Sequence, residues 1–229
     1  MTSEFANRTA IVTGASSGIG RATARLLAGR GARVAVFSRS VEPSEDDAIL
    51  AVRGDITSEA DVERLFAATE ARFGACDLLV NNAGMIDPAP LVDTPPERWE
   101  RMFAVNVHGA YLATRRALPR MIAARRGAIV NVSSISGVPG PEKFPGWVSY
   151  CASKAAVIGM TDALAVEVKD HGIRVNAVSP GSVDTKMWAN ASGGAPAAMT
   201  ADEVAETILF LLSDRSRPMN GQNLDVWSV

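Results

Sequence analysis

Short apolar runs alternate with longer amphipathic stretches along the whole chain, and this alternation constrains the fold more than any other feature. The runs are rich in Val and Ile and lack strict apolar–polar alternation, which is typical of parallel strands buried on both faces. Helical patterns separate them at residues 58–74, 95–125 and 200–214. The repeated β-α-β order predicts a doubly wound, parallel α/β sheet of about seven strands with helices on both faces. The expected strands lie at residues 8–14, 33–38, 48–55, 77–84, 127–134, 173–180 and 223–227.

One connection in this pattern is short. Only the sequence RSVEPSEDD, residues 39–47, separates the second expected strand from the third, and it contains Pro43. A crossover helix packed on the sheet needs more residues than this, so we expect a loop or a single turn. No linker or low-complexity segment interrupts the rest, and residues 1–229 are predicted to form a single domain.

Composition excludes several classes of function. The net charge of −2 gives no reason to expect nucleic acid or an anionic membrane as a partner. No apolar run reaches the roughly 18 residues that a membrane span needs. The two cysteines, Cys76 and Cys151, fit no metal-ligand spacing, and we expect a packing role for Cys151 in the interior. The sequence therefore predicts a cytoplasmic protein without a metal site.

A glycine-rich turn follows the first expected strand and precedes a helix. Gly14, Gly18 and Gly20 stand in the sequence TGASSGIG. Glycines let a backbone approach a pyrophosphate, which then lies on the free N–H groups of the helix N-terminus. A tight strand-to-helix turn with no ligand would use the same residues. The position after the first strand favours a dinucleotide site.

The end of the second expected strand carries Ser38 and Arg39. An NAD site usually has an acidic residue here for the ribose 2′-hydroxyl, whereas a hydroxyl and a guanidinium suit a 2′-phosphate. A solvated loop arginine is the alternative. The pair predicts that NADP(H) is preferred, with NAD(H) possible.

Tyr150 and Lys154 form a second candidate pair. Residues four apart share a helix face, so the ammonium can lie close to the phenol. A nearby positive charge would lower the pKa of the tyrosine towards the range of a general acid. Two surface residues would show the same spacing by chance. Other polar residues gather at the carboxyl ends of the expected strands: Asp55, Asn81 to Gly84, Ser133 with Ser134, and Ser179 to Gly181.

Seven motifs in order resemble the short-chain dehydrogenase/reductase family, in its compact single-domain branch with a Rossmann-type fold. They are TGASSGIG, GDIT, NNAG, FAVNVHGAY, IVNVSSISG, YCASK and RVNAVSPGSVDT, and the resemblance covers essentially the whole chain. It implies a catalytic tetrad of Asn106, Ser134, Tyr150 and Lys154. Tyr150 would transfer the proton, Lys154 would lower its pKa and hold the nicotinamide ribose, Ser134 would bind the substrate oxygen, and Asn106 would hold a relay water. Ser133 competes with Ser134 for the serine role.

The same resemblance implies a set of cofactor contacts. Those around the pyrophosphate are Gly14, Ser17, Ile19 and Gly20. Asp55 and Ile56 would lie near the adenine, Asn82 near the adenosine ribose, and Val183 and Thr185 near the carboxamide. Ser38, Arg39, Ala83, Gly84, Tyr150, Lys154, Pro180 and Gly181 complete the predicted cofactor site.

Two segments depart from the family pattern. The segment between Ser134 and Tyr150 is a few residues longer than is usual in the family. The stretch after Thr185 is much shorter than the usual substrate-covering lid. The short lid, which contains Gly193 and Gly194, predicts a mobile segment over an open cleft. Trp147 and Trp188 flank that cleft and either line it or serve ordinary packing.

These observations predict an NADP(H)-dependent oxidoreductase that moves hydride between the nicotinamide and a small carbonyl or secondary alcohol. The alternatives are a 3-oxoacyl-thioester reductase and a cofactor-binding sensor without catalysis. A nucleotide-fold methyltransferase shares the glycine-rich turn but does not predict the Tyr–Lys pair. The resemblance also suggests a homotetramer built on helices around residues 100–125 and 150–168.

Overall fold

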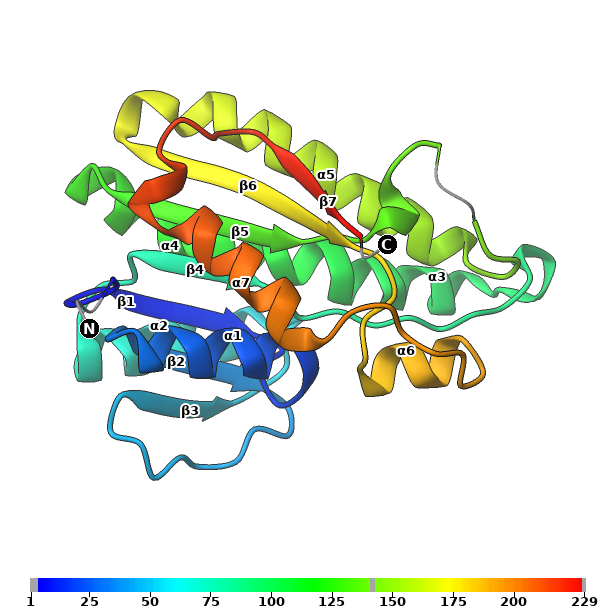
Figure 1. The fold of residues 1–229 in the computed structure, drawn as a ribbon, viewed down its shortest axis with the longest axis horizontal. Helices are drawn as coiled ribbons and strands as arrows, with labels where there is room; N and C mark the ends of the chain where they lie inside the picture. Colours follow the sequence, from blue (N-terminus) through cyan, green and yellow to red (C-terminus); the bar gives the residue numbers. More distant parts are fainter. Residues whose placement is uncertain (1–3, 141–142, 228–229) are drawn as a thin grey trace.

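Seven parallel strands form one sheet at the centre of the protein. The computed structural model describes residues 4–140 and 143–227. The strand order is β3-β2-β1-β4-β5-β6-β7, and every neighbouring pair is parallel (Figure 1). This confirms the predicted Rossmann-type α/β fold. The strands are β1 (Thr9–Thr13), β2 (Arg33–Ser38), β3 (Ile49–Arg53), β4 (Leu78–Asn81), β5 (Gly127–Val132), β6 (Ile173–Pro180) and β7 (Asn223–Val226).

Helices cover both faces of the sheet, and each face has its own hydrophobic cluster. Helices α1 (Gly18–Gly29) and α7 (Ala201–Leu212) pack on one face, and α2 (Glu59–Phe73), α4 (Gly109–Ala124) and α5 (Val148–Val168) pack on the other (Figure 1). In β1, Ala10 and Val12 belong to the first cluster and Ile11 to the second. Since both faces are buried, each central strand needs apolar residues at successive positions, which explains the continuous runs in the sequence.

The expected helices form where the sequence predicts them. Ser58 caps α2 by accepting a hydrogen bond from the Asp61 N–H, and Thr200 and Glu203 form a reciprocal capping box at the start of α7. The long pattern over residues 95–125 is interrupted: α3 (Pro96–Phe103) continues through a π-helical turn (Ala104–His108) into α4. The sequence analysis did not anticipate that turn, and π-helical turns are frequent at functional sites.

The connection between β2 and β3 contains no helix, as predicted from its length. The chain crosses from one strand to the other through residues 39–48, which form a loop at the β3 edge (Figure 1). The sheet order reverses between β1 and β4, because β2 and β3 lie on one side of this pair and β5 to β7 on the other. Ligands of doubly wound folds bind outside the carboxyl ends of the strands at such a switch point.

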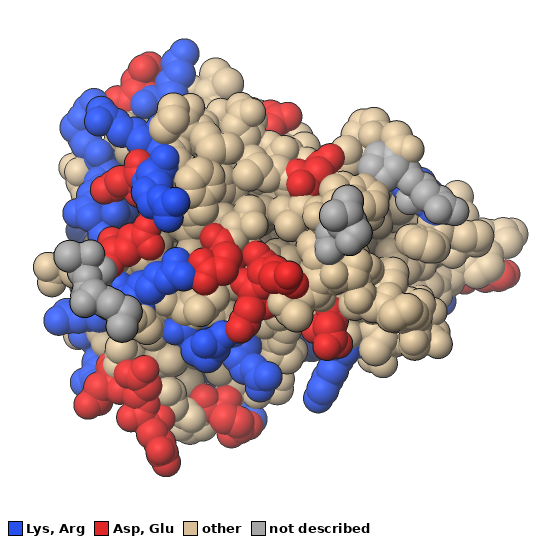
Figure 2. Space-filling model, viewed as in Figure 1, with Lys and Arg blue, Asp and Glu red and all other residues tan. Residues whose placement is uncertain are grey.

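The carboxyl ends of the strands differ in surface character from the rest of the visible face. Figure 2 shows that most Lys, Arg, Asp and Glu side chains lie towards the amino ends of the strands, while the opposite side is mostly uncharged. The short helix α6 (Lys186–Ala191) lies on this weakly charged side, together with α3 (Figure 1). No helix within residues 4–140 and 143–227 combines the length and apolarity that crossing a membrane requires.

Candidate active site

A cavity of about 490 Å³ opens at the carboxyl ends of the strands, around the switch point between β1 and β4. It brings together all but two of the predicted site residues, from Ser38 and Arg39 at one end to Tyr150 and Lys154 at the other. The two exceptions are Gly20 and Asn106, which lie behind the wall of the cavity. The sequence analysis missed several lining residues, because nothing but tertiary packing brings them here: Met85, Ile86, Arg101, Phe144, Met187 and Trp227.

The glycine-rich turn packs tightly against the segment that follows β4. Gly14 has a φ of +67°, and a Cβ atom there would lie 2.7 Å from the Ala83 Cα. A Cβ atom on Gly20 would lie 2.4 Å from the Asn82 Nδ2. That Nδ2 donates hydrogen bonds to the Thr13 and Gly14 carbonyl oxygens at 2.9 and 3.0 Å. Asn82 therefore holds the turn in place, and Gly20 is required by packing behind the cavity wall.

The start of α1 can receive an anion. Ser17 is the N-cap residue, its side chain makes no capping hydrogen bond, and the first turn of the helix has no acidic residue. Ser17, Gly18 and Ile19 all line the cavity. Free N–H groups and the positive end of the helix dipole together favour a phosphate group at this position. The turn and the helix start therefore fit the pyrophosphate of a dinucleotide.

The end of the cavity at β2 and β3 carries opposite charges. Arg39 and Asp55 both line it, and the hydrogen bond from the Thr57 N–H holds the pKa of the Asp55 carboxyl below its usual range, with a smaller contribution from Arg39. Thr57 binds the Asp55 Oδ1 through both its N–H and its hydroxyl at 2.9 Å. Asp55 is thus a fixed anion, and Arg39 is a cation on an exposed loop beside it.

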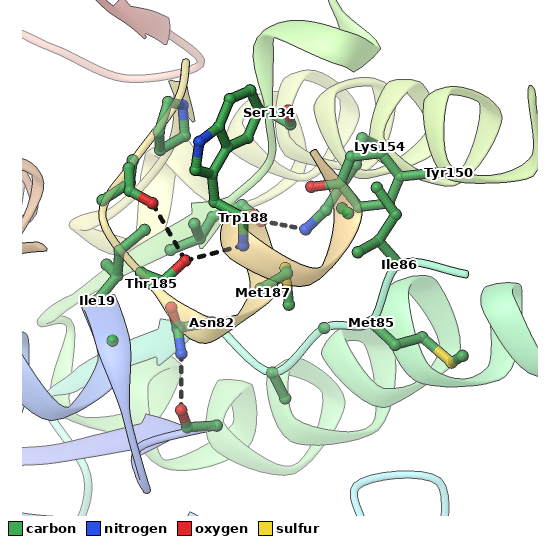
Figure 3. Close-up of a pocket in the computed structure, with 18 of the residues that line it drawn as sticks. Ile19, Asn82, Met85, Ile86, Ser134, Tyr150, Lys154, Thr185, Met187 and Trp188 are labelled. Carbon is green, nitrogen blue, oxygen red and sulfur yellow. Dashed lines mark hydrogen bonds between the residues drawn. The ribbon is translucent and has the colours of Figure 1, made fainter. Parts of the chain in front are cut away.

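Tyr150 and Lys154 lie one turn apart on α5, and both are buried, with 8% and 4% of their surfaces exposed (Figure 3). The Lys154 Nζ lies 5.7 Å from the centroid of the Tyr150 ring and donates a hydrogen bond to the Val132 carbonyl oxygen at 2.8 Å. Burial lowers the pKa of Lys154 to about 8. The pair is therefore assembled as expected.

The pKa of Tyr150 is raised, so the expectation that it would be lowered is wrong. Burial raises the pKa of Tyr150 to about 12, and a hydrogen bond with Ser134 opposes that change. The physical reason is desolvation, since a phenolate in a buried position loses its hydration. Sequence spacing placed the ammonium near the phenol but could not reveal how deeply both groups are buried.

The two neighbouring serines have different environments. The Ser133 hydroxyl donates a hydrogen bond to the Lys154 carbonyl oxygen at 2.8 Å, so its proton is used to fix the backbone of α5. The Ser134 hydroxyl lies beside Tyr150, and its oxygen accepts the Ser136 N–H at 3.1 Å. Of the two hydroxyls, that of Ser134 is the one that pairs with Tyr150.

Asn106 lies in the π-helical turn and is 2% exposed. Its Oδ1 accepts the Met85 N–H at 2.7 Å, and its Nδ2 donates to the Met85 carbonyl oxygen at 3.0 Å and to the Ser153 hydroxyl at 2.9 Å. The Ser153 hydroxyl in turn donates to the Tyr150 carbonyl oxygen at 2.8 Å. The Asn106 side chain therefore ties the segment after β4 to the helix that carries Tyr150.

The segment after β6 covers one side of the cavity. The Thr185 hydroxyl oxygen caps α6 by accepting the Trp188 N–H at 3.2 Å (Figure 3). The Trp188 Nε1 donates to the Ala195 carbonyl oxygen at 2.8 Å. Trp147 and Trp188 both line the cavity and also pack against each other. The two alternatives for these residues, lining and packing, are therefore both correct.

The cysteines do not add a reactive group to the site. Cys76 is buried, whereas Cys151 is only half-buried, so the expectation of an interior position for Cys151 is wrong. Burial raises the pKa of both thiols, to about 12 for Cys76. The residues that the structure describes include no cluster of three or more His, Cys, Asp or Glu side chains that could hold a metal ion.

Comparisons with known proteins agree with this geometry. The short chain dehydrogenase family model matches residues 8–195. A cis-4-hydroxycyclohexanecarboxylate dehydrogenase of Sinomonas cyclohexanicum is 43% identical, over 97% of this chain and 96% of its own. A crystal structure of levodione reductase has a TM-score of 0.89 at 29% identity, over 97% of this chain and 96% of its own. A 3-ketoacyl-(acyl-carrier-protein) reductase from Brucella melitensis, complexed with NADH, has a TM-score of 0.89 at 33% identity, over 97% of each chain.

Proposed function

The chain belongs to the short chain dehydrogenase family, whose members are oxidoreductases acting on alcohol and carbonyl groups with NAD(P)(H). From this premise we propose that it interconverts a small ketone and the corresponding secondary alcohol, prefers NADP(H), and uses Tyr150 as its general acid and base. The observation that carries the proposal is the convergence of Ser134, Tyr150 and Lys154 on a cavity that also contains the glycine-rich turn.

A bound nicotinamide cofactor would supply the hydride for carbonyl reduction or accept it in alcohol oxidation. In reduction, the Tyr150 hydroxyl gives its proton to the carbonyl oxygen, so that the C=O double bond becomes an alcohol. Ser134 donates a hydrogen bond to the same oxygen and stabilises its developing negative charge. The Lys154 Nζ keeps two donors beyond its bond to Val132, and these are available for the cofactor ribose.

The raised pKa of Tyr150 bears on the pH dependence of the two directions. With a pKa of about 12 the phenol holds its proton at neutral pH, which is the form from which carbonyl reduction starts. Alcohol oxidation requires the phenolate, whose fraction increases with pH. We therefore propose that the oxidation rate increases with pH across the range in which the reduction rate is flat or falling.

The first test is NADPH oxidation in the presence of a panel of ketones, aldehydes and one 3-oxoacyl thioester. Tyr150→Phe is the matched control, because it keeps the ring and removes the hydroxyl. Turnover in the natural protein and loss of at least about 1,000-fold in the variant is the expected result. Full activity of Tyr150→Phe would refute the role of Tyr150. Cofactor binding without turnover of any compound would favour the alternative of a non-catalytic sensor.

The narrower alternative, reduction of a 3-oxoacyl thioester, is supported by the similarity to the Brucella protein. The same panel decides it, because a thioester reductase turns over the thioester faster than any simple ketone.

The preference for NADP(H) is supported by Arg39, which stands where an acidic residue would otherwise bind a ribose. A bond between a guanidinium and a phosphate is worth roughly 1.5–3 kcal/mol, so Arg39→Ala is expected to raise the KM for NADPH about 10-fold or more and leave that for NADH unchanged. Arg217→Ala is the matched control, since Arg217 is exposed and lies outside the cavity. Equal KM values for NADPH in both variants would refute the preference.

We also propose a homotetramer and a cytoplasmic location. The helices expected to form subunit contacts expose apolar side chains, including Tyr111 and Ile122 on α4 and Val166 on α5. The free thiols of Cys76 and Cys151 suit a reducing compartment. Sedimentation equilibrium tests the assembly, and a monomer at micromolar concentration would refute it.

A further inference from the structure

Three aromatic rings form a corner at the wall of the cavity. Phe144 and Trp147 come from the segment between β5 and α5, and Trp188 comes from α6. The ring centroids are 4.8 Å apart for Phe144 and Trp147, and 6.5 Å apart for each of the two pairs with Trp188. The Trp188 ring is nearly perpendicular to the other two, at 71° and 77°. We call these three residues the aromatic corner.

The aromatic corner adjoins the catalytic phenol. The rings of Trp147 and Tyr150 meet edge to face, with centroids 5.7 Å apart and an angle of 88°. A carbonyl oxygen that bonds to the Tyr150 and Ser134 hydroxyls therefore places its carbon substituents against the aromatic corner or on the opposite wall. The substituents of the reacting carbon must fit between these surfaces.

The rings of the aromatic corner differ in how they are held. Trp147 is only 8% exposed, and the Trp188 ring is anchored through its Nε1, which donates to the Ala195 carbonyl oxygen, whereas Phe144 is 43% exposed. Trp147 and Trp188 thus present two flat surfaces at a large angle, on segments from different parts of the chain. A wall of this shape favours a flat group.

Met85, Ile86 and Met187 add apolar surface to this part of the cavity (Figure 3). Arg101 on α3 also lines the cavity and brings a cation to it. Among the described residues that line the cavity, the one carboxylate is Asp55, at the distant β3 end. An aromatic site for a cationic ligand would gain from a nearby carboxylate, and none is available here. The chemistry disfavours a cationic group and favours an apolar surface against the aromatic corner.

We propose that the substrate is a ring ketone or ring secondary alcohol, with an alicyclic or aryl-fused ring packed on the aromatic corner. This rests on the proposed function, because it assigns the substrate of the same site. A ring presents a flat, preformed surface to both faces of the corner. A linear chain of equal carbon number must first lose the freedom of several bonds, which opposes its binding. Stacked and edge-to-face contacts then add to the burial of apolar area.

The test compares two ketones of the same size, cyclohexanone and 2-hexanone, by their kcat/KM values with NADPH. In the natural protein we expect the ring ketone to be favoured about 10-fold. Trp188→Leu keeps an apolar side chain but removes the flat surface, and should reduce this preference at least about threefold. Trp188→Phe keeps an aromatic ring and should retain most of the preference for cyclohexanone. Trp99→Leu is the matched control, because Trp99 stacks on Phe103 and does not line the cavity.

Three results would overturn the inference. The first is a kcat/KM for 2-hexanone that equals or exceeds that for cyclohexanone in the natural protein. The second is an unchanged ratio of the two kcat/KM values in Trp188→Leu, and the third is an equal loss of this ratio in Trp99→Leu. Circular dichroism and the Kd for NADPH establish that each variant is folded.

Failure of the proposed function gives a different result, in which the natural protein turns over neither ketone. The inference is then tested by binding alone, through quenching of tryptophan fluorescence in the NADPH-loaded protein. Saturable quenching by cyclohexanone at a lower concentration than by 2-hexanone supports the ring-binding surface. Equal quenching, or none, overturns it.

Discussion

Replacement of Lys154 by methionine should separate the contribution of this residue to catalysis from its effect on stability. Lys154 is buried, and burial lowers its pKa from 10.5 to about 8. The folded state therefore disfavours the charged form. Methionine has a similar length and no charge, so it removes the cost of burying the ammonium.

The magnitude follows from the two pKa values. The pKa of Lys154 is about 8 in the folded protein and 10.5 in the unfolded chain. At pH 7 this difference lowers the free energy of unfolding by about 3 kcal/mol. At about pH 9.5 the folded protein holds a mostly neutral lysine, and the cost decreases to about 1 kcal/mol. The sign is fixed by proton binding: between the two pKa values the unfolded chain binds more protons, so the stability of the natural protein increases with pH. Loss of the bond from Nζ to the Val132 carbonyl oxygen subtracts about 1–3 kcal/mol from the stability of the variant at both pH values.

The assay is urea unfolding of the natural protein and Lys154→Met, at pH 7 and at about pH 9.5, with protein concentration fixed because of the proposed tetramer. The free energy of unfolding of Lys154→Met minus that of the natural protein should decrease by about 2 kcal/mol from pH 7 to about pH 9.5. This change does not depend on the constant loss of the hydrogen bond to Val132. Activity should be lost at both. A difference between the two proteins that is the same at both pH values would refute the argument, since it would mean that Lys154 titrates normally.

Three further substitutions test the parts of the fold that position the site. Gly20→Ala should abolish detectable NADPH binding in a fluorescence titration, because its Cβ atom would lie 2.4 Å from the Asn82 Nδ2 and displace the glycine-rich turn; a normal Kd would refute this. Arg174→Met should lower the free energy of unfolding by about 3 kcal/mol in urea, since the guanidinium binds the last carbonyl oxygens of α7 from a half-buried position, and a loss below about 1 kcal/mol would contradict that role. Thr200→Ala removes the capping box with Glu203 and should cost about 1 kcal/mol by the same method, with unchanged stability as the contrary result.

Patterns of neighbouring residues were sufficient to predict the sheet. Continuous Val- and Ile-rich runs identified all seven strands, because a strand buried on both faces has apolar residues at successive positions. The length of residues 39–47 was sufficient to predict a crossover without a helix.

Features that depend on distant parts of the chain were not predictable in this way. The aromatic corner joins Trp188 to Phe144 and Trp147 across helix α5 and strand β6, and no spacing indicates that contact. The resemblance favoured Ser134 over Ser133, but the different hydrogen bonds of the two hydroxyls could not be predicted from their neighbouring positions. The pKa of Tyr150 was predicted with the wrong sign, because charge proximity can be inferred from spacing but the depth of burial cannot.

The bare crossover at residues 39–48 has a consequence for engineering and for divergence within a lineage. Because no helix covers it and Val41 is its one residue in the hydrophobic cluster, we expect that the exposed part of this loop, residues 42–47, can change in length or sequence with little repacking of the core. It begins with Arg39 and lies near Asp55, at the far end of the cavity from Tyr150 and the aromatic corner. The residue proposed to select the cofactor and the surface proposed to bind the substrate thus lie on separate portions of the chain, and we expect that each can be exchanged while the other is kept.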